Sequence, residues 1–363
     1  MSARSLVAFL AVFVWTTTSA EEPLVADPSP PDVVAIGAKI HAARDCYLRG
    51  EYDKKTGLRL DLSNTDVEDI SGVKGLPLAS LNLHNTAVKD LAPLKKMKLR
   101  CLDIGATAVR DISSLKGMPL QHLHLSGHVS DMSPLAGMPL RTLRVDAGRS
   151  LSDVSALAGA PITNLNLRYT NVSDLSPLKG MSLVSLDVSG TKVSHLSHLK
   201  GMQLTSLKLV RTLVSDLSPL AGMKLTHLNL FGTRVTDLSP LKGMPLVYVN
   251  LGETQVSDLT PLAGMPLVSL HIHKTRVTDL RPLHNVPLRT LSVVGSDVSD
   301  LSPLRHNRTL LSIDSLPGQI TKGTKVFEAI EKRRIELAEQ RIKKSGPNHQ
   351  VHRTRSAARS WEK

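Results

Sequence analysis

The sequence predicts a solenoid, a stack of short coils with a parallel β-sheet along its concave side. Three observations lead to this fold class. Hydrophobic residues make up 41% of the 363-residue chain and aromatic residues only 3%, so the interior must be built from aliphatic side chains. Leucines recur with a period of 21 residues over most of the chain. Each period contains leucines spaced two apart, as a half-buried strand requires. Length alone would suggest two or three domains, but such a period is typical of repeat proteins.

Twelve copies of the period follow one another between residues 57 and 308. The spacing is 21 residues except around Leu140, where a step of 20 is followed by a step of 22. We call each copy a coil and count positions within it from its first residue. The coils open at Gly57, Leu78, Leu99, Leu120, Leu140, Ile162, Leu183, Leu204, Leu225, Leu246, Leu267 and Leu288.

The common pattern of a coil is L-x-x-L-x-L-x-x-T-x-V-x-D-L-S-P-L-x-G-M-P, as in the segment from Leu225 to Pro245. Positions four and six point inward from a short strand, whereas positions three, five and seven point outward. Seven positions are apolar, more than one coil can bury by itself. Stacked coils therefore share one continuous core, and their strands pair in parallel.

This pattern resembles that of leucine-rich-repeat proteins over about residues 57 to 315. The short coil with its D-L-S-P-L turn is most similar to internalin-type and other exported bacterial repeats. The resemblance implies an α/β-type solenoid: a right-handed superhelix with a concave parallel β-sheet, irregular turns on the convex side and helical end caps.

Two polar columns have structural explanations. The Asp that opens the D-L-S-P-L turn occurs in eleven coils, from Asp69 to Asp300. We expect it to accept hydrogen bonds from backbone N–H groups of the following turn rather than to bind calcium. The Thr after the strand should satisfy a backbone group at a buried bend. It occurs as Thr65, Thr86, Thr107, Thr170, Thr191, Thr212, Thr233, Thr254 and Thr275.

The two ends of the chain predict export and end caps. Residues 1–20 have the charge, the apolar run and the small final residues of a secretory signal peptide, which places the protein in the periplasm, at the cell surface or outside the cell. A Pro-rich linker (21–31) and an N-terminal cap (32–56) follow. After the coils we expect a C-terminal cap with a basic helix (309–345) and a disordered basic tail (346–363).

The C-terminal cap should begin with a thirteenth strand around Leu310, Leu311 and Ile313. Its helix has an apolar stripe of Val326, Phe327, Ile330 and Leu337. Residues 317–363 carry twelve Lys and Arg against five Glu, which is more than half of the net charge of +13. The basic tail suits electrostatic contact with anionic surfaces, although export argues against nucleic acid as a partner.

The concave face is where we expect function. The chain has no nucleophile elbow, P-loop, zinc-protease or kinase motif, so no enzymatic activity and no cofactor are predicted. A shallow curved sheet instead offers a long surface to a macromolecule. The sequence therefore predicts a non-catalytic binding module for a protein partner, with a glycan as the alternative. The competing interpretation is a structural scaffold or spacer tethered by the basic C-terminal helix and tail.

Three aromatic residues lie within the coils, and all fall outside the core positions. Phe231 and Tyr248 stand in adjacent coils, and exposed rings are common anchors at interfaces, so they mark the favoured contact region. Incidental surface rings are the alternative explanation. The predicted partner-binding residues are Tyr169, His227, Asn229, Phe231, Tyr248, Asn250, His271 and His273.

A second cluster lies in coils three and four. Cys101 and Asp103 on one strand should lie beside His122 and His124 on the next, and this combination of side chains can hold zinc. We expect ordinary solvated polar residues here and predict no metal. A disulfide between Cys101 and Cys46, the only other cysteine, competes for the same thiol.

Overall fold

The computed structural model describes residues 58–145, 147–315 and 319–322, and seven further residues between 328 and 339 that belong to a helix. The predicted signal peptide, linker, N-terminal cap and tail lie outside the described residues, so they stay predictions. The chain divides into two compact units, Met1–Leu225 and Thr226–Lys363. We call them the N-terminal unit and the C-terminal unit and describe each by itself.

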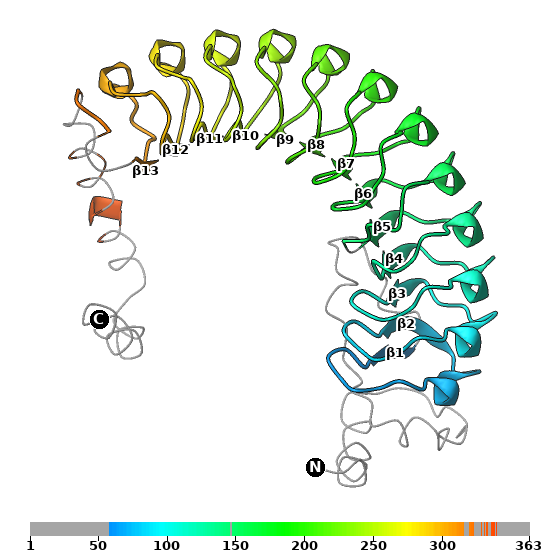
Figure 1. Ribbon diagram of the computed structural model, residues 1–363. Helices are drawn as coiled ribbons and strands as arrows, with labels where there is room; N and C mark the ends of the chain where they lie inside the picture. The colour runs from blue at the N-terminus through cyan, green and yellow to red at the C-terminus, as the bar shows by residue number, and fades with distance from the viewer. Residues whose placement is uncertain are drawn as a thin grey trace, which may run out of the picture. The chain divides into compact units, whose positions relative to one another are not determined.

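The N-terminal unit contains eight short strands, one for each of the first eight coils. Each strand pairs in parallel with the next along the chain, and equivalent leucines, such as Leu81 and Leu102, lie side by side. The strands line the inner side of this unit (Figure 1). They are β1 (Leu58–Asp61), β2 (Leu78–Asn82), β3 (Cys101–Asp103), β4 (His122–Leu125), β5 (Thr142–Val145), β6 (Asn164–Asn166), β7 (Ser185–Asp187) and β8 (Ser206–Lys208).

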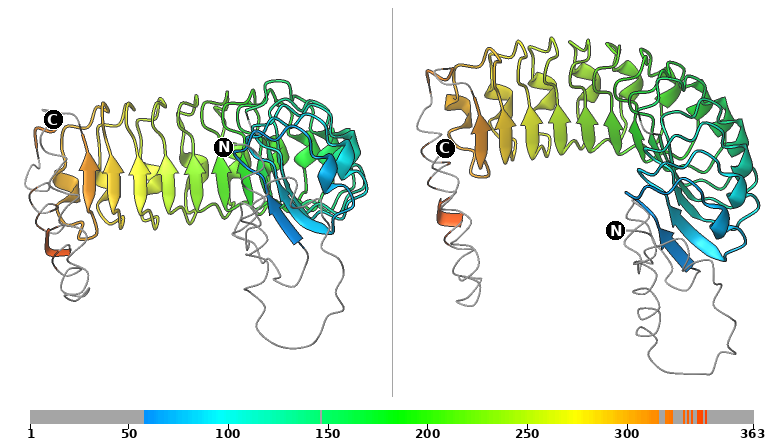
Figure 2. Two further views of the ribbon diagram at one scale, coloured as in Figure 1. Left: turned by 90° about the horizontal axis from the view of Figure 1, so that it is seen from below. Right: turned by 60° about the horizontal axis from the view of Figure 1, so that its bottom comes forward.

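The C-terminal unit repeats this arrangement with five strands, whose parallel order is visible in Figure 2. The last of them contains Ile313 and follows the twelfth coil. The strands are β9 (His227–Asn229), β10 (Tyr248–Asn250), β11 (Ser269–His271), β12 (Thr290–Ser292) and β13 (Ser312–Asp314).

The turns on the opposite side of each unit are more regular than the sequence suggested. Every coil forms a single 3-10 turn of three residues, where irregular turns were expected (Figure 1). In the N-terminal unit these are η2 (Ser71–Val73), η3 (Ala92–Leu94), η4 (Ser113–Leu115), η5 (Ser133–Leu135), η6 (Ser155–Leu157), η7 (Ser176–Leu178), η8 (Ser197–Leu199) and η9 (Ser218–Leu220). In the C-terminal unit they are η10 (Ser239–Leu241), η11 (Thr260–Leu262), η12 (Arg281–Leu283) and η13 (Ser302–Leu304).

The aspartate column holds these turns. In all eleven coils that have it, the Asp Oδ1 accepts a hydrogen bond from the backbone N–H two residues later, at 2.7–2.8 Å. That N–H belongs to the first residue of the 3-10 turn, so the Asp lies one residue before the N-cap. The Ser71 N–H and hydroxyl, for example, lower the pKa of Asp69. The prediction of a backbone acceptor is confirmed.

The threonine column also does what its position predicts. Each of the nine Thr hydroxyls donates to the backbone carbonyl three residues earlier, at 2.6–2.8 Å. Ser296 makes the same bond to Val293 in coil twelve. The hydroxyl therefore closes the bend that follows each strand.

The core is aliphatic throughout the described part of the chain. In coil nine, Leu228, Leu230, Val235, Leu238 and Leu241 are all at most 1% exposed. No Phe, Tyr or Trp occurs among the buried residues of the described ranges. Burying one such Leu contributes about 1.5–3 kcal/mol, and the identical columns add these contributions along each unit.

The C-terminal end is covered in part as expected. Gln319 donates to the carbonyls of Val293 and Ser296, and Ile330 is buried. Leu337, however, is 40% exposed, so its assignment to the apolar stripe was wrong: the helix presents that residue to solvent. Val326 and Phe327 lie outside the described residues. No helix in the described part of the chain is long and apolar enough to span a membrane.

One turn residue in coil two is strained, and this leads to a stability prediction. The residue aligned with the Gly of the common pattern has a positive φ in ten coils; it is Gly in nine of them and Lys96, with φ 66°, in the tenth. A left-handed backbone costs a non-glycine residue about 1–2 kcal/mol, and Gly loses about 0.5–1 kcal/mol in backbone entropy. We expect Lys96→Gly to raise the free energy of unfolding in urea by about 0.5–1 kcal/mol. Lys95→Gly, at a φ of −53°, should lower it instead.

Candidate functional site

The outward-facing residues at position five have a structural role in addition to their exposure on the sheet. In seven coils an Asn or Asp at this position accepts a hydrogen bond from the backbone N–H two residues later, at 2.8–3.1 Å. This column therefore contributes to the backbone hydrogen bonding of the coils. Asn229 and Asn250 are among these residues: their Oδ1 atoms accept from Phe231 and Gly252. Their side-chain NH₂ groups carry the donors that remain for a partner.

Three rings form a row across β9, β10 and β11 of the C-terminal unit. His227, Tyr248 and Ser269 occupy the same register position on these strands, and Asn250 pairs with His271. The rings of His227 and Tyr248 are stacked, with centroids 6.1 Å apart and planes inclined by 19°. Tyr248 and His271 have centroids 5.6 Å apart and are inclined by 50°. Neighbouring strands thus present a continuous row of half-buried and exposed rings.

A second pair of rings, Phe231 and His273, lies just beyond the ends of these strands. Their centroids are 5.4 Å apart although they belong to coils nine and eleven. The residue at the same position of coil ten is Gly252, and a Cβ there would lie 2.2 Å from Cε1 of His273. The missing side chain is what allows the two rings to meet. We call His227, Phe231, Tyr248, His271 and His273 the ring cluster.

The surroundings of His271 favour its neutral imidazole. Burial, and then the proximity of His273, lower the pKa of His271, although Asp314 opposes them. The His271 ring also contacts the Ser269 hydroxyl at 3.1 Å through Nε2. Because the folded chain prefers the neutral imidazole, His271 reduces stability as the pH falls below its ordinary pKa of about 6.5.

Tyr169 belongs to the N-terminal unit, whereas the other predicted contact residues belong to the C-terminal unit. Its side chain is 42% exposed, and its φ is 59°. The ring lies over Gly190, and the Arg168 guanidinium stands 4.8 Å from the ring centroid. Tyr169 is therefore an exposed ring with its own cation–π contact rather than a member of the ring cluster.

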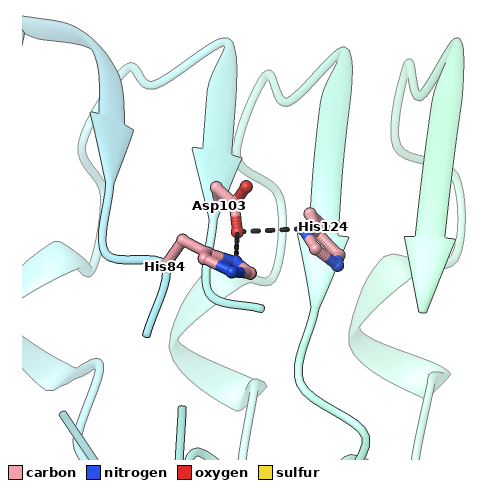
Figure 3. Close-up of side chains that lie close together, drawn as sticks. All are labelled: His84, Asp103 and His124. Carbon is pink, nitrogen blue, oxygen red and sulfur yellow. Dashed lines mark ion pairs between the residues drawn. The ribbon is translucent and has the colours of Figure 1, made fainter. Parts of the chain in front are cut away.

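Only part of the predicted set of metal ligands in coils three and four comes together in the structure. Cys101 pairs with His122, and Asp103 with His124, as expected from the strand register. Cys101 is disulfide-bonded, which removes its thiol as a ligand; Cys46 lies outside the described residues. Burial, and then Arg141, lower the pKa of His122. The carboxylate of Asp103 is flanked instead by His124 and by His84 of coil two (Figure 3).

His84 was not among the predicted ligands, because the prediction rested on residues at positions three and five only. His84 stands at position seven, where coil three has Gly105. A Cβ on Gly105 would lie 2.3 Å from Cε1 of His124, so the glycine leaves the space that the His124 ring fills. The rings of His84 and His124 stack with centroids 5.6 Å apart. A Gly flanked by His in neighbouring coils is the signal that would have identified this group.

Comparisons with known proteins bear on the fold. No protein-family model and no curated protein sequence matches the chain. Among solved structures, an internalin of Listeria monocytogenes (inlF) is 24% identical, with a TM-score of 0.65, and the match covers 73% of this chain and 85% of that one. A leucine-rich-repeat protein of Leptospira interrogans is 16% identical, with a TM-score of 0.46, covering 70% of this chain and 83% of that one.

The functional domain of InlJ from Listeria monocytogenes is 20% identical, with a TM-score of 0.46, and the match covers 71% of this chain and 53% of that one. At such identities the similarity concerns the fold. The parallel strands and regular 3-10 turns of both units agree with it. The chain has the fold of a leucine-rich-repeat solenoid.

Proposed function

We propose that this protein is a non-catalytic, exported binding module that captures a protein partner on the sheet of its C-terminal unit. The observation that carries the proposal is the ring cluster, in which His227, Tyr248 and His271 follow one another across β9, β10 and β11 and the pair Phe231 and His273 meets just beyond the strand ends. Tyr and Phe rings provide large contact area with little loss of side-chain entropy, and they dominate the energetics of protein interfaces.

The polar surroundings of the cluster support a protein ligand. The NH₂ groups of Asn229 and Asn250 lie on the same strands as the rings, and their oxygens are already engaged by the backbone. Their orientation is therefore set before a partner binds, which reduces the entropy lost on association. Rings flanked by oriented amide donors also suit a glycan, which is the alternative ligand for the same surface.

The test is capture by the immobilised full chain from extracts of the producing cells. We expect the double variant Phe231→Ala, Tyr248→Ala to lose the captured partner, because truncation of one interface anchor costs about 2 kcal/mol or more, which is about 30-fold in affinity. Tyr169→Ala, which removes an exposed ring from the N-terminal unit, is the matched control and should retain the partner. Protease or glycosidase treatment of the captured material distinguishes protein from glycan.

The scaffold interpretation predicts the opposite pattern. If removal of the tail 346–363 abolishes capture while the double ring variant captures normally, the basic tail carries the interaction and the proposal is wrong. This truncation leaves Gln319 and Ile330, which cover the last coils, in place.

A further inference from the structure

We propose that His84, Asp103 and His124 bind one divalent transition-metal ion, with Zn²⁺ as the best match to their chemistry. The three residues come from coils two, three and four of the N-terminal unit, and their ligand atoms all lie within 4.8 Å of one another (Figure 3). This site is independent of the ring cluster.

The spacing of the donor atoms fits a shared ion. Nδ1 of His124 lies 3.0 Å and Nδ1 of His84 3.4 Å from Oδ1 of Asp103. Zn²⁺ binds nitrogen and oxygen ligands at about 2.0–2.2 Å, which places the ligand atoms of a tetrahedral ion about 3.3–3.6 Å apart. Both histidines therefore already stand near the separation from the carboxylate that a common ion requires.

The carboxylate needs a cation. The Asp103 side chain is 8% exposed, and its Oδ2 is buried with no hydrogen-bond partner among the described residues. A buried carboxylate is costly unless opposite charge or hydrogen bonds compensate it. A metal ion between the carboxylate and the two imidazoles supplies this charge, and the free lone pairs of Oδ2 offer a second coordination point.

The surrounding backbone orients the ligands in advance. The Gly105 N–H donates to Oδ1 of Asp103 at 2.8 Å and so fixes the plane of the carboxylate. The same glycine leaves room for the His124 ring, whose side chain is also 8% exposed. Hydrogen bonds from the backbone to a ligating carboxylate orient that ligand in metal sites. Two ligands are thus rigidly placed, whereas His84, at 30% exposure, lies nearer the solvent.

The donor set selects the class of ion. Two imidazoles and one carboxylate are borderline ligands that suit Zn²⁺ and other first-row divalent metals, whereas Ca²⁺ and Mg²⁺ prefer sites made of oxygen alone. With three protein ligands, a tetrahedral ion keeps one position for water, which the exposure of His84 allows. The disulfide at Cys101 excludes thiolate ligation by that residue.

The experiment is titration of the untagged full chain, stripped with chelator, with Zn²⁺ by calorimetry and with Co²⁺ by visible absorption. We expect Zn²⁺ binding that loses one equivalent per chain, or weakens at least tenfold, in Asp103→Asn and in His84→Ala. Bound Co²⁺ should show the intense d–d bands of a four-coordinate ion, and the same variants should lose them. Affinity should fall as the solution is acidified, because protons compete with the metal ion for its ligands.

The matched control is His271→Ala, which removes a half-buried histidine of the C-terminal unit and should leave the titration unchanged. His84→Ala guards against misfolding of Asp103→Asn, since His84 is the most exposed of the three ligands; circular dichroism checks both variants. The proposal is overturned if stoichiometry, affinity and Co²⁺ spectrum are the same in the wild type and in the folded variants. In that case the two histidines contact Asp103 without a shared metal ion.

Discussion

Leu209→Ala is expected to lower the free energy of unfolding by about 2–5 kcal/mol, since it removes a fully buried side chain from the shared core of the N-terminal unit. The value includes both the lost transfer free energy and the cavity left behind, because neighbouring coils hold the backbone in place. Urea denaturation followed by far-ultraviolet circular dichroism measures the change. Because each coil of a repeat protein contacts mainly its neighbours, the coils around the cavity should unfold at a lower urea concentration than the others.

Leu213→Ala is the matched control, since it makes the same chemical change four residues later in the same coil. Leu213 is 44% exposed, so its truncation should change the free energy of unfolding by no more than about 0.5 kcal/mol. Equal losses in the two variants would contradict the assignment of inward and outward positions within the coil.

Thr107→Val is expected to lower the free energy of unfolding by about 1–3 kcal/mol, although the two side chains have nearly the same shape. The Thr107 hydroxyl donates to the carbonyl of Ile104 at 2.7 Å, and the residue is buried. Valine leaves that carbonyl without this donor at a bend that water does not reach. The measurement is again urea denaturation of the full chain.

Thr107→Ser keeps the hydroxyl and is the control. Ser296 shows that serine can make the same bond at the equivalent position, so this variant should lose only the small contribution of one methyl group. A larger loss in Thr107→Ser than in Thr107→Val would mean that packing of the methyl group, rather than the hydrogen bond, holds the bend.

The fold could be predicted because every coil repeats the same requirement. The leucine spacing sets the inward positions, and the Asp and Thr columns stand next to the backbone groups that they satisfy, so local chemistry decides their partners. Because the pattern is repeated in twelve coils, the assignment of each column does not depend on any single residue. The regularity of the 3-10 turns was missed because the pattern D-L-S-P-L specifies where the chain turns but not which backbone hydrogen bond closes the turn.

The sites were less predictable because their contacts join different coils. Asn229 and Asn250 were assigned to a partner only, but their oxygens serve the backbone two residues later. His84 was overlooked, and Cys101 and His122 were placed in its stead, because side-chain reach depends on what the intervening coil leaves open. Strand register predicts which residues of adjacent strands lie side by side. It does not predict in which direction an imidazole ring points.

Glycine at position seven has a consequence for the modularity of this protein. In a solenoid each coil ordinarily interacts with its immediate neighbours, so coils can be duplicated or deleted without loss of the fold. Gly105 and Gly252 instead let side chains of second neighbours touch, as His84 does with His124 and Phe231 with His273. The smallest transplantable cassette for either surface is therefore three consecutive coils, and a single inserted coil would separate its parts while leaving the scaffold intact.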